Sequence, residues 1–134
     1  MTTVDADAAV LARLRSLCAD WPEVEEAELQ DRPLFRVRRK RFAIFNGSCS
    51  PDRPRWRGCG RSLHLLTEPS ERAALEQDPR FAASPHHGDH GWVTCALDPL
   101  TTDWAEIAEL LESAYRQAAP AELRGILDQR GSPG

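Results

Sequence analysis

The sequence predicts a single α+β domain, a two-layer sandwich in which an antiparallel β-sheet carries the N- and C-terminal helices on one face. Three observations support this fold class. Apolar residues recur at helical spacing near both ends of the chain, segments of period 2 gather in the middle, and 134 residues suit one compact domain. We expect the domain to span residues 1–130 and the polar residues 131–134 to form a flexible end.

The first predicted element is a helix over about residues 5–19, because its apolar residues form one stripe. These residues are Val10, Leu11, Leu14, Leu17 and Cys18. Pro22 disfavours the helical conformation in the residue before it, so the helix must end near Trp21. Residues 25–29 alternate between acidic and apolar side chains, which predicts a first strand.

Residues 33–38 and 41–46 predict a hairpin with a two-residue turn at Arg39-Lys40. This register pairs Arg38 with Arg41 and Val37 with Phe42. One face of the hairpin is then apolar and the other cationic. The apolar face would carry Phe35, Val37, Phe42 and Ile44, and the cationic face Arg36, Arg38 and Arg41.

The middle of the chain predicts a loop, a strand and a short helix. Residues 46–61 contain Gly and Pro without periodicity, which is typical of a mobile loop. Leu63 and Leu65 alternate with polar residues, as in a half-buried strand. Thr67 and Pro69 then supply a cap and an early-turn proline for a helix that ends near residues 78–79.

The last third predicts one strand and two helices. After a polar loop, residues 92–97 form a strand whose Trp92 lies on the face away from the core. Asp103 and Glu106 resemble a capping box at the start of a long amphipathic helix. Pro120 ends or bends this helix, and residues 121–129 allow one further short helix.

Composition argues against several classes of protein. No apolar run approaches the roughly 20 residues needed to cross a bilayer, and the polar N-terminus lacks the features of a secretion signal. We therefore expect a cytoplasmic protein without a membrane partner, and a monomer. The four cysteines, Cys18, Cys49, Cys59 and Cys95, form no C-x-x-C pair, so free thiols are expected rather than a zinc site or a disulfide framework.

The net charge of −4 conceals a strong segregation of charge. Ten basic residues and only one acid lie between Arg32 and Arg61, about +9 in formal charge, and the rest of the chain carries about −13. Such a chain can present a basic face to a polyanion while its acidic remainder keeps it soluble. A role of the acidic face in binding other proteins is a further alternative, supported only by this asymmetry of charge.

The central basic residues predict phosphate contacts with DNA or another nucleic acid. The proposed contacts are Arg36, Arg38, Arg39, Lys40, Arg41, Arg53, Arg55, Trp56, Arg57 and Arg61. The alternative is that these cations are paired with the protein's own carboxylates. The acids nearest in sequence are Asp20, Glu23, Glu25, Glu26, Glu28 and Asp31.

Two tryptophans suggest a second class of function, a non-catalytic protein that sequesters a planar small molecule on the open sheet face. Trp56 lies between two arginines in the predicted loop and could stack on a flat ligand, or fold back on the protein. Trp92 could line a pocket with Arg36, His64 and His90, or be covered by the loop.

Metal binding and catalysis have weaker support. His86, His87, Asp89 and His90 lie too close in sequence to enclose one ion in a tetrahedral shell, and the acidic segment 23–31 has no defined ligand geometry. We recognise no nucleophile motif, no phosphate-binding Gly-rich loop and no carboxylate pair at fixed spacing. We therefore expect no metal, no cofactor and no enzymatic activity.

Five short segments in this order resemble the MmcQ/YjbR family. They are residues 21–26 (WPEVEE), 35–43 (FRVRRKRFA), 60–65 (GRSLHL), 90–98 (HGWVTCALD) and the Ala119-Pro120 pair after the last long helix. The resemblance covers nearly the whole chain. It implies a frataxin/CyaY-like fold and DNA binding through a double-wing arrangement.

The chain departs from the family pattern in two places. The family usually has Gly before the hairpin lysine, where this sequence has Arg39, so the turn should be strained or longer. Residues 47–61 are longer than the usual connection and unusually rich in arginine, which suggests a specialised role for this segment.

Overall fold

The computed structural model describes residues 3–29, 32–46, 61–83 and 91–131. Within these ranges the chain forms six strands and four helices. Their order is α1 (Thr3–Cys18), β1 (Val24–Leu29), β2 (Arg32–Val37), β3 (Lys40–Asn46), β4 (Ser62–Leu66), α2 (Pro69–Leu75), β5 (Phe81–Ala83), β6 (Trp92–Ala96), α3 (Trp104–Ala118) and α4 (Ala121–Gly131).

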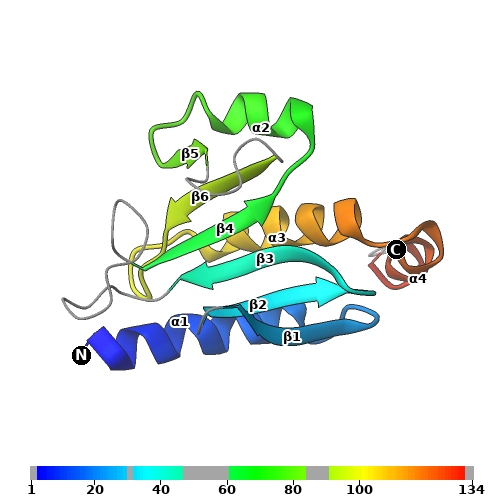
Figure 1. Ribbon diagram of the computed structural model, residues 1–134, viewed down its shortest axis with the longest axis horizontal. Coiled ribbons are helices and arrows are strands. Elements are labelled where there is room, and N and C mark those ends of the chain that lie inside the picture. Colours follow the sequence, from blue (N-terminus) through cyan, green and yellow to red (C-terminus); the bar gives the residue numbers. More distant parts are fainter. Residues whose placement is uncertain (1–2, 30–31, 47–60, 84–90, 132–134) are drawn as a thin grey trace.

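The strands form one antiparallel sheet in the order β1-β2-β3-β4-β6-β5. Figure 1 shows α1 and α3 side by side along one face of this sheet, while α2 lies beyond the β5–β6 edge and α4 follows the end of α3. The α+β two-layer fold predicted from the sequence is therefore confirmed.

The core lies between the sheet and helices α1 and α3. Val10 and Leu14 of α1 and Leu111 and Tyr115 of α3 are completely buried there. The stripe predicted for the first helix is therefore the face that packs. A smaller apolar cluster of Leu34, Ile44 and Trp92 lies apart from this core.

The predicted hairpin register is wrong: the turn lies one residue earlier in the chain, and the pairs next to it differ from the prediction by two residues. Val37 pairs with Lys40 and Arg36 with Arg41, so the turn residues are Arg38 and Arg39. The register then shifts, and Phe35 pairs with Ala43. This shift is a β-bulge in which one extra residue, Phe42, is accommodated in β3.

The bulge also corrects the predicted faces of β3. Because side chains alternate along a strand, the extra residue lets Phe42 and Ala43 both join the main core. Ile44 then belongs to the cluster with Leu34 and Trp92, not with Phe35 as the simple alternation predicted. Trp92 itself lies away from the main core, on the side expected from the sequence.

Two further local expectations differ from the structure. The segment after α2, predicted as a polar loop, contains the short edge strand β5. Thr67 does not cap α2; its Oγ1 donates to the carbonyl of Gly91, 2.8 Å away, and the residue at the cap position is Glu68. By contrast, the Asp103 side chain accepts from the Glu106 backbone N–H at the start of α3, as the capping-box pattern predicts.

Two buried cysteines reinforce the core rather than offering reactive groups. Cys18 and Cys95 are free, and burial raises the pKa of each thiol to about 12. Both therefore remain protonated near neutral pH.

Among the described helices, none has the length and apolar character needed to span a membrane.

An aromatic cluster ties the hairpin to α3. The Phe42 and Tyr115 rings meet edge to face with centroids 5.7 Å apart, and Trp21 lies 5.3 Å from Tyr115 between centroids. The Tyr115 hydroxyl donates to the Pro22 carbonyl over 2.7 Å, which fixes the chain just before β1. A single helix residue thereby positions both β1 and the bulged part of β3.

We expect Tyr115→Phe to lower the free energy of unfolding by about 1 kcal/mol, because the Pro22 carbonyl would lose a part-buried hydrogen bond. Urea unfolding followed by circular dichroism measures this loss. Ser113→Ala is the matched control, since it removes a less buried hydroxyl from the same helix. Equal losses in the two variants would contradict the anchoring role of Tyr115.

Candidate nucleic-acid interface

The turn between β2 and β3 has an unusual backbone for its residues. Arg38 and Arg39 have φ angles of 47° and 70°, as the two central residues of a type I′ turn require. Gly, Asn or Asp normally occupies such positions because a longer side chain is strained there. The turn thus keeps its two-residue length with an arginine in place of the family's usual Gly.

Arg38 is held by two carboxylates from different parts of the chain. Its guanidinium makes two hydrogen bonds to Glu23, of 2.8 and 3.1 Å, and another to Glu122 of α4. The Arg38 partner lowers the pKa of the Glu23 carboxyl, so the pair is ionised at neutral pH. Arg38 therefore fixes the turn and is not a free cation.

Arg36 is paired in the same way across the sheet. The register places Glu25, Arg36 and Arg41 in one row over β1, β2 and β3. The Arg36 guanidinium lies 3.4 Å from the Glu25 carboxylate, whereas Arg41 forms no ion pair with any described residue. The row therefore carries one uncompensated positive charge, on Arg41.

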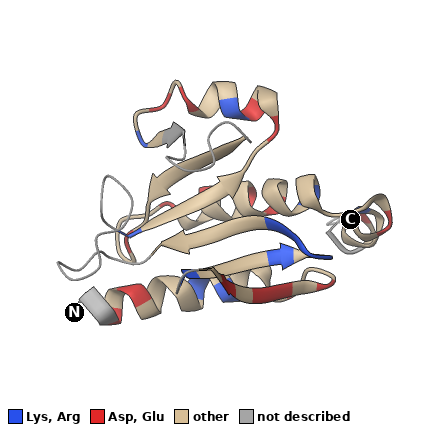
Figure 2. Ribbon diagram, in the orientation of Figure 1, with Lys and Arg blue, Asp and Glu red and all other residues tan. Residues whose placement is uncertain are grey.

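Three consecutive residues, Arg39, Lys40 and Arg41, form the exposed cationic part of the hairpin. We call them the basic run. All three are exposed, and none makes an ion pair within the described residues. Figure 2 shows basic residues at the turn end of β2 and β3, beside the acidic residues of β1.

The structure does not bring Arg61 into this surface. Its guanidinium lies 2.6 Å from the Asp7 carboxylate of α1, and its side chain is only 12% exposed. Arg61 therefore joins α1 to the strand end rather than facing solvent. The remaining predicted contacts, Arg53, Arg55, Trp56 and Arg57, lie outside the described residues.

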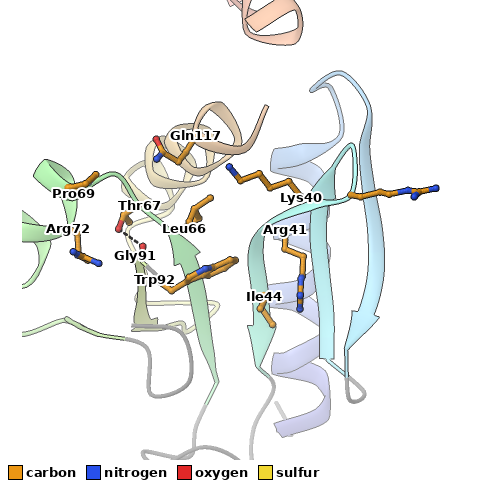
Figure 3. A pocket seen from close by; sticks show the side chains of 11 residues that line it. Lys40, Arg41, Ile44, Leu66, Thr67, Pro69, Arg72, Gly91, Trp92 and Gln117 are labelled. Carbon is orange, nitrogen blue, oxygen red and sulfur yellow. Dashed lines mark hydrogen bonds between the residues drawn. The ribbon is translucent and has the colours of Figure 1, made fainter. Parts of the chain in front are cut away.

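The basic run borders a cavity of about 720 Å³, which we call the hairpin cavity. It opens where β3 and β4 separate, because their pairing begins only at Ala43 and Leu65. Figure 3 shows Lys40 extending from the hairpin toward Gln117 and Leu66, with Trp92 extending from β6 toward β3. The lining residues are Arg39, Lys40, Arg41, Ile44, Leu66, Thr67, Pro69, Arg72, Gly91, Trp92 and Gln117.

Among the described residues of the predicted ligand pocket, Trp92 alone lines this cavity. Arg36 is turned to Glu25, and His64 is 1% exposed within the sheet. His90 lies outside the described residues, as do the other residues considered for a metal, His86, His87 and Asp89. In the described part of the chain, no group of three potential metal ligands comes together.

Sequence reasoning missed Arg72 and Gln117. Arg72 lies on α2, a helix without buried residues, so periodicity gives no sign of which way it faces. Gln117 lies at the end of α3, more than 70 residues from the hairpin in sequence. Only the fold places these two side chains beside the basic run.

Comparison with known proteins identifies the family. The family model described as YjbR matches residues 19–117, most of the chain and all of the sheet. The chain belongs to the YjbR family. This YjbR protein is also similar in fold to a crystal structure of a protein from Pseudomonas syringae. The TM-score is 0.60 at 18% identity, over 81% of this chain and 97% of the other. No curated protein matches the chain.

We expect Arg39→Gly to raise the free energy of unfolding by about 0.5–1 kcal/mol, because glycine removes the strain at a φ of 70°. Lys40→Gly is the matched control: its φ is not positive, so added chain entropy should lower stability by a similar amount. Urea unfolding of both variants gives the two values. The strain argument fails if the two substitutions change stability in the same direction.

Proposed function

We propose that this YjbR protein binds nucleic acid through phosphate contacts made by the basic run. The observation that carries the proposal is the contrast within one hairpin. Arg36 and Arg38 are paired with the protein's own carboxylates, whereas Arg39, Lys40 and Arg41 are exposed without an ion pair among the described residues. The resemblance to a DNA-binding double-wing family implies the same activity.

Phosphate is the partner that fits these cations. Neighbouring cations repel one another, and a phosphate backbone relieves that repulsion while releasing counterions. Such contacts give affinity without reading the base sequence. We therefore propose a non-catalytic protein with little sequence preference.

The negative charge outside the hairpin supports a localised contact. Glu23, Glu25 and Glu122 hold the paired arginines on the side of β1 and α4. A polyanion approaching from that side would meet carboxylates. The favourable approach is from the side of the hairpin cavity, where the basic run lies.

We expect the Arg39→Ala/Lys40→Ala/Arg41→Ala variant to bind DNA more weakly and with less salt dependence. The slope of log affinity against log salt should flatten by about 0.9 for each duplex phosphate that the variant cannot neutralise. Fluorescence anisotropy of a labelled duplex over a series of salt concentrations measures both quantities.

The charge-matched control is Arg15→Ala/Arg80→Ala/Arg116→Ala, which removes three cations that are already paired with carboxylates. Its salt slope should stay close to that of the unchanged protein. If both triple variants lose affinity equally, net charge rather than the hairpin controls binding. An unchanged slope in the hairpin variant would refute the proposed contacts.

The hairpin cavity also supports the second candidate function, the sequestering of a planar small molecule. The supporting observation is Trp92 beside Ile44 and Leu66 in a space of about 720 Å³, a size usual for ligand sites. Saturable binding of neutral planar aromatics, insensitive to salt and without DNA binding, would favour this candidate over the first.

A further inference from the structure

Two arginines lie directly opposite each other in the hairpin, Arg36 on β2 and Arg41 on β3. Side chains paired in this way lie on the same face of a sheet, with their Cβ atoms about 5 Å apart. Like charges in this position repel each other, and an anion held between them relieves the repulsion. Arg41 is exposed and makes no ion pair with a described residue, so its charge is available to such an anion.

Among the described residues of β1, β2 and β3, one carboxylate lies on the same face as this pair. Glu25 of β1 lies next to Arg36 in the same row. Glu26 and Glu28 alternate with Glu25 along β1, so they lie on the other face. The next row on the shared face is apolar and consists of Ala27, Leu34 and Ile44. A single carboxylate therefore serves two guanidinium groups.

The contact between Glu25 and Arg36 is loose. It is a single hydrogen bond of 3.4 Å, longer than the roughly 2.7–2.9 Å usual between charged groups. The side chains of Arg36 and Glu25 are 37% and 57% exposed. By comparison, the neighbouring Glu26 accepts two hydrogen bonds from Arg15, of 2.6 and 2.8 Å. Because exposed ion pairs contribute little free energy, an incoming anion can displace Glu25 from Arg36.

The neighbouring cations of the hairpin are placed differently. Arg38 makes three hydrogen bonds to two carboxylates and is therefore held more firmly than Arg36. Lys40 lies opposite Val37, a residue of the main core, so it leaves the sheet on the other face from Arg41. Figure 3 shows Lys40 and Arg41 extending in different directions. Arg36 is thus the cation of β2 that can share a ligand with Arg41.

We propose that Arg36 and Arg41 together bind one phosphate group, which displaces the Glu25 carboxylate from Arg36. A guanidinium donates to phosphate oxygens in the same paired geometry as to a carboxylate, and the phosphate charge offsets both cations. The inference rests on the proposed function insofar as the phosphate belongs to a nucleic-acid strand. A free phosphate group has the same chemistry, so inorganic phosphate and a DNA duplex serve as separate probes.

NMR of the arginine Nε–H groups tests the site directly, with the signals of Arg36 and Arg41 assigned from the Arg36→Lys and Arg41→Lys variants. Inorganic phosphate at low ionic strength should shift both signals in a saturable way and with one dissociation constant. A short DNA duplex should shift the same two signals. A response of Arg41 alone would overturn the shared site.

Arg36→Gln and Arg41→Gln should each weaken duplex binding about threefold or more, because each removes one donor to the shared phosphate. Fluorescence anisotropy measures the affinities, and urea unfolding checks that the variants are folded. The loss in the double variant should be smaller than the product of the two single losses, since the two side chains act on one group. Losses that multiply would show independent contacts and overturn the shared site.

Glu25→Gln removes the competing carboxylate and should strengthen duplex binding about threefold, with no gain in an Arg36→Gln background. Glu26→Gln is the matched control. It makes the same change of charge at the adjacent residue, but its carboxylate lies on the other face and is bonded to Arg15. Equal gains from the two substitutions would assign the effect to net charge and overturn the displacement of Glu25.

The results separate this inference from the proposed function. Salt-sensitive duplex binding that depends on the basic run, but not on Arg36 or Glu25, would overturn the shared site alone. Binding of inorganic phosphate at Arg36 and Arg41 without binding of any strand would overturn the proposed function and identify a free phosphate group as the ligand. Displacement of inorganic phosphate from both arginines by the duplex supports both.

Discussion

The extra residue in β3 is the constraint on which the hairpin surface depends. Phe42 is accommodated by a bulge because its ring packs against Tyr115, in a cluster that also includes Trp21. On the turn side of the bulge, Arg41 lies opposite Arg36; beyond it, Ile44 faces the smaller cluster with Trp92. One packing requirement in the core thus determines which side chains reach the opposite face.

The fold, and not the composition alone, determines which basic side chains of this protein are paired with carboxylates. The hairpin's basic residues lie close together in sequence, between positions 36 and 41. Among them, only Arg36 and Arg38 are paired with described carboxylates, which belong to Glu25, Glu23 and Glu122. Exposed ion pairs contribute little to stability, so their main consequence here is to fix the turn and remove two cations from the outer surface. The basic run is what remains, and its three residues line the hairpin cavity.

Most of the fold could be predicted from the sequence, because it follows from local patterns. These patterns are the apolar stripe of α1, the alternation in β4 and β6, and the capping residue Asp103 of α3. The bulge could not be predicted from the sequence, because it depends on contacts between Phe42 and a helix about 70 residues away. For the candidate site, the sequence indicated the basic hairpin and Trp92. Arg72 carries no local signal, and the pairing of Arg61 with Asp7 depends on where α1 lies.

A regular hairpin with the same residues would not build the same cavity. Without the extra residue, Ile44 would share the core face with Phe42, and the wall beside Trp92 would lose an apolar side chain. Extending the Phe35–Ala43 pairing to the turn without a bulge would pair Val37 with Arg41, which would take Lys40 out of β3. Pairing between β3 and β4 stops at Ala43 and Leu65, so the residues before the bulge are free to stand away from β4 and border the cavity. The presence of the basic run and Trp92 in the lining of one cavity therefore follows from the bulge and the early end of that pairing.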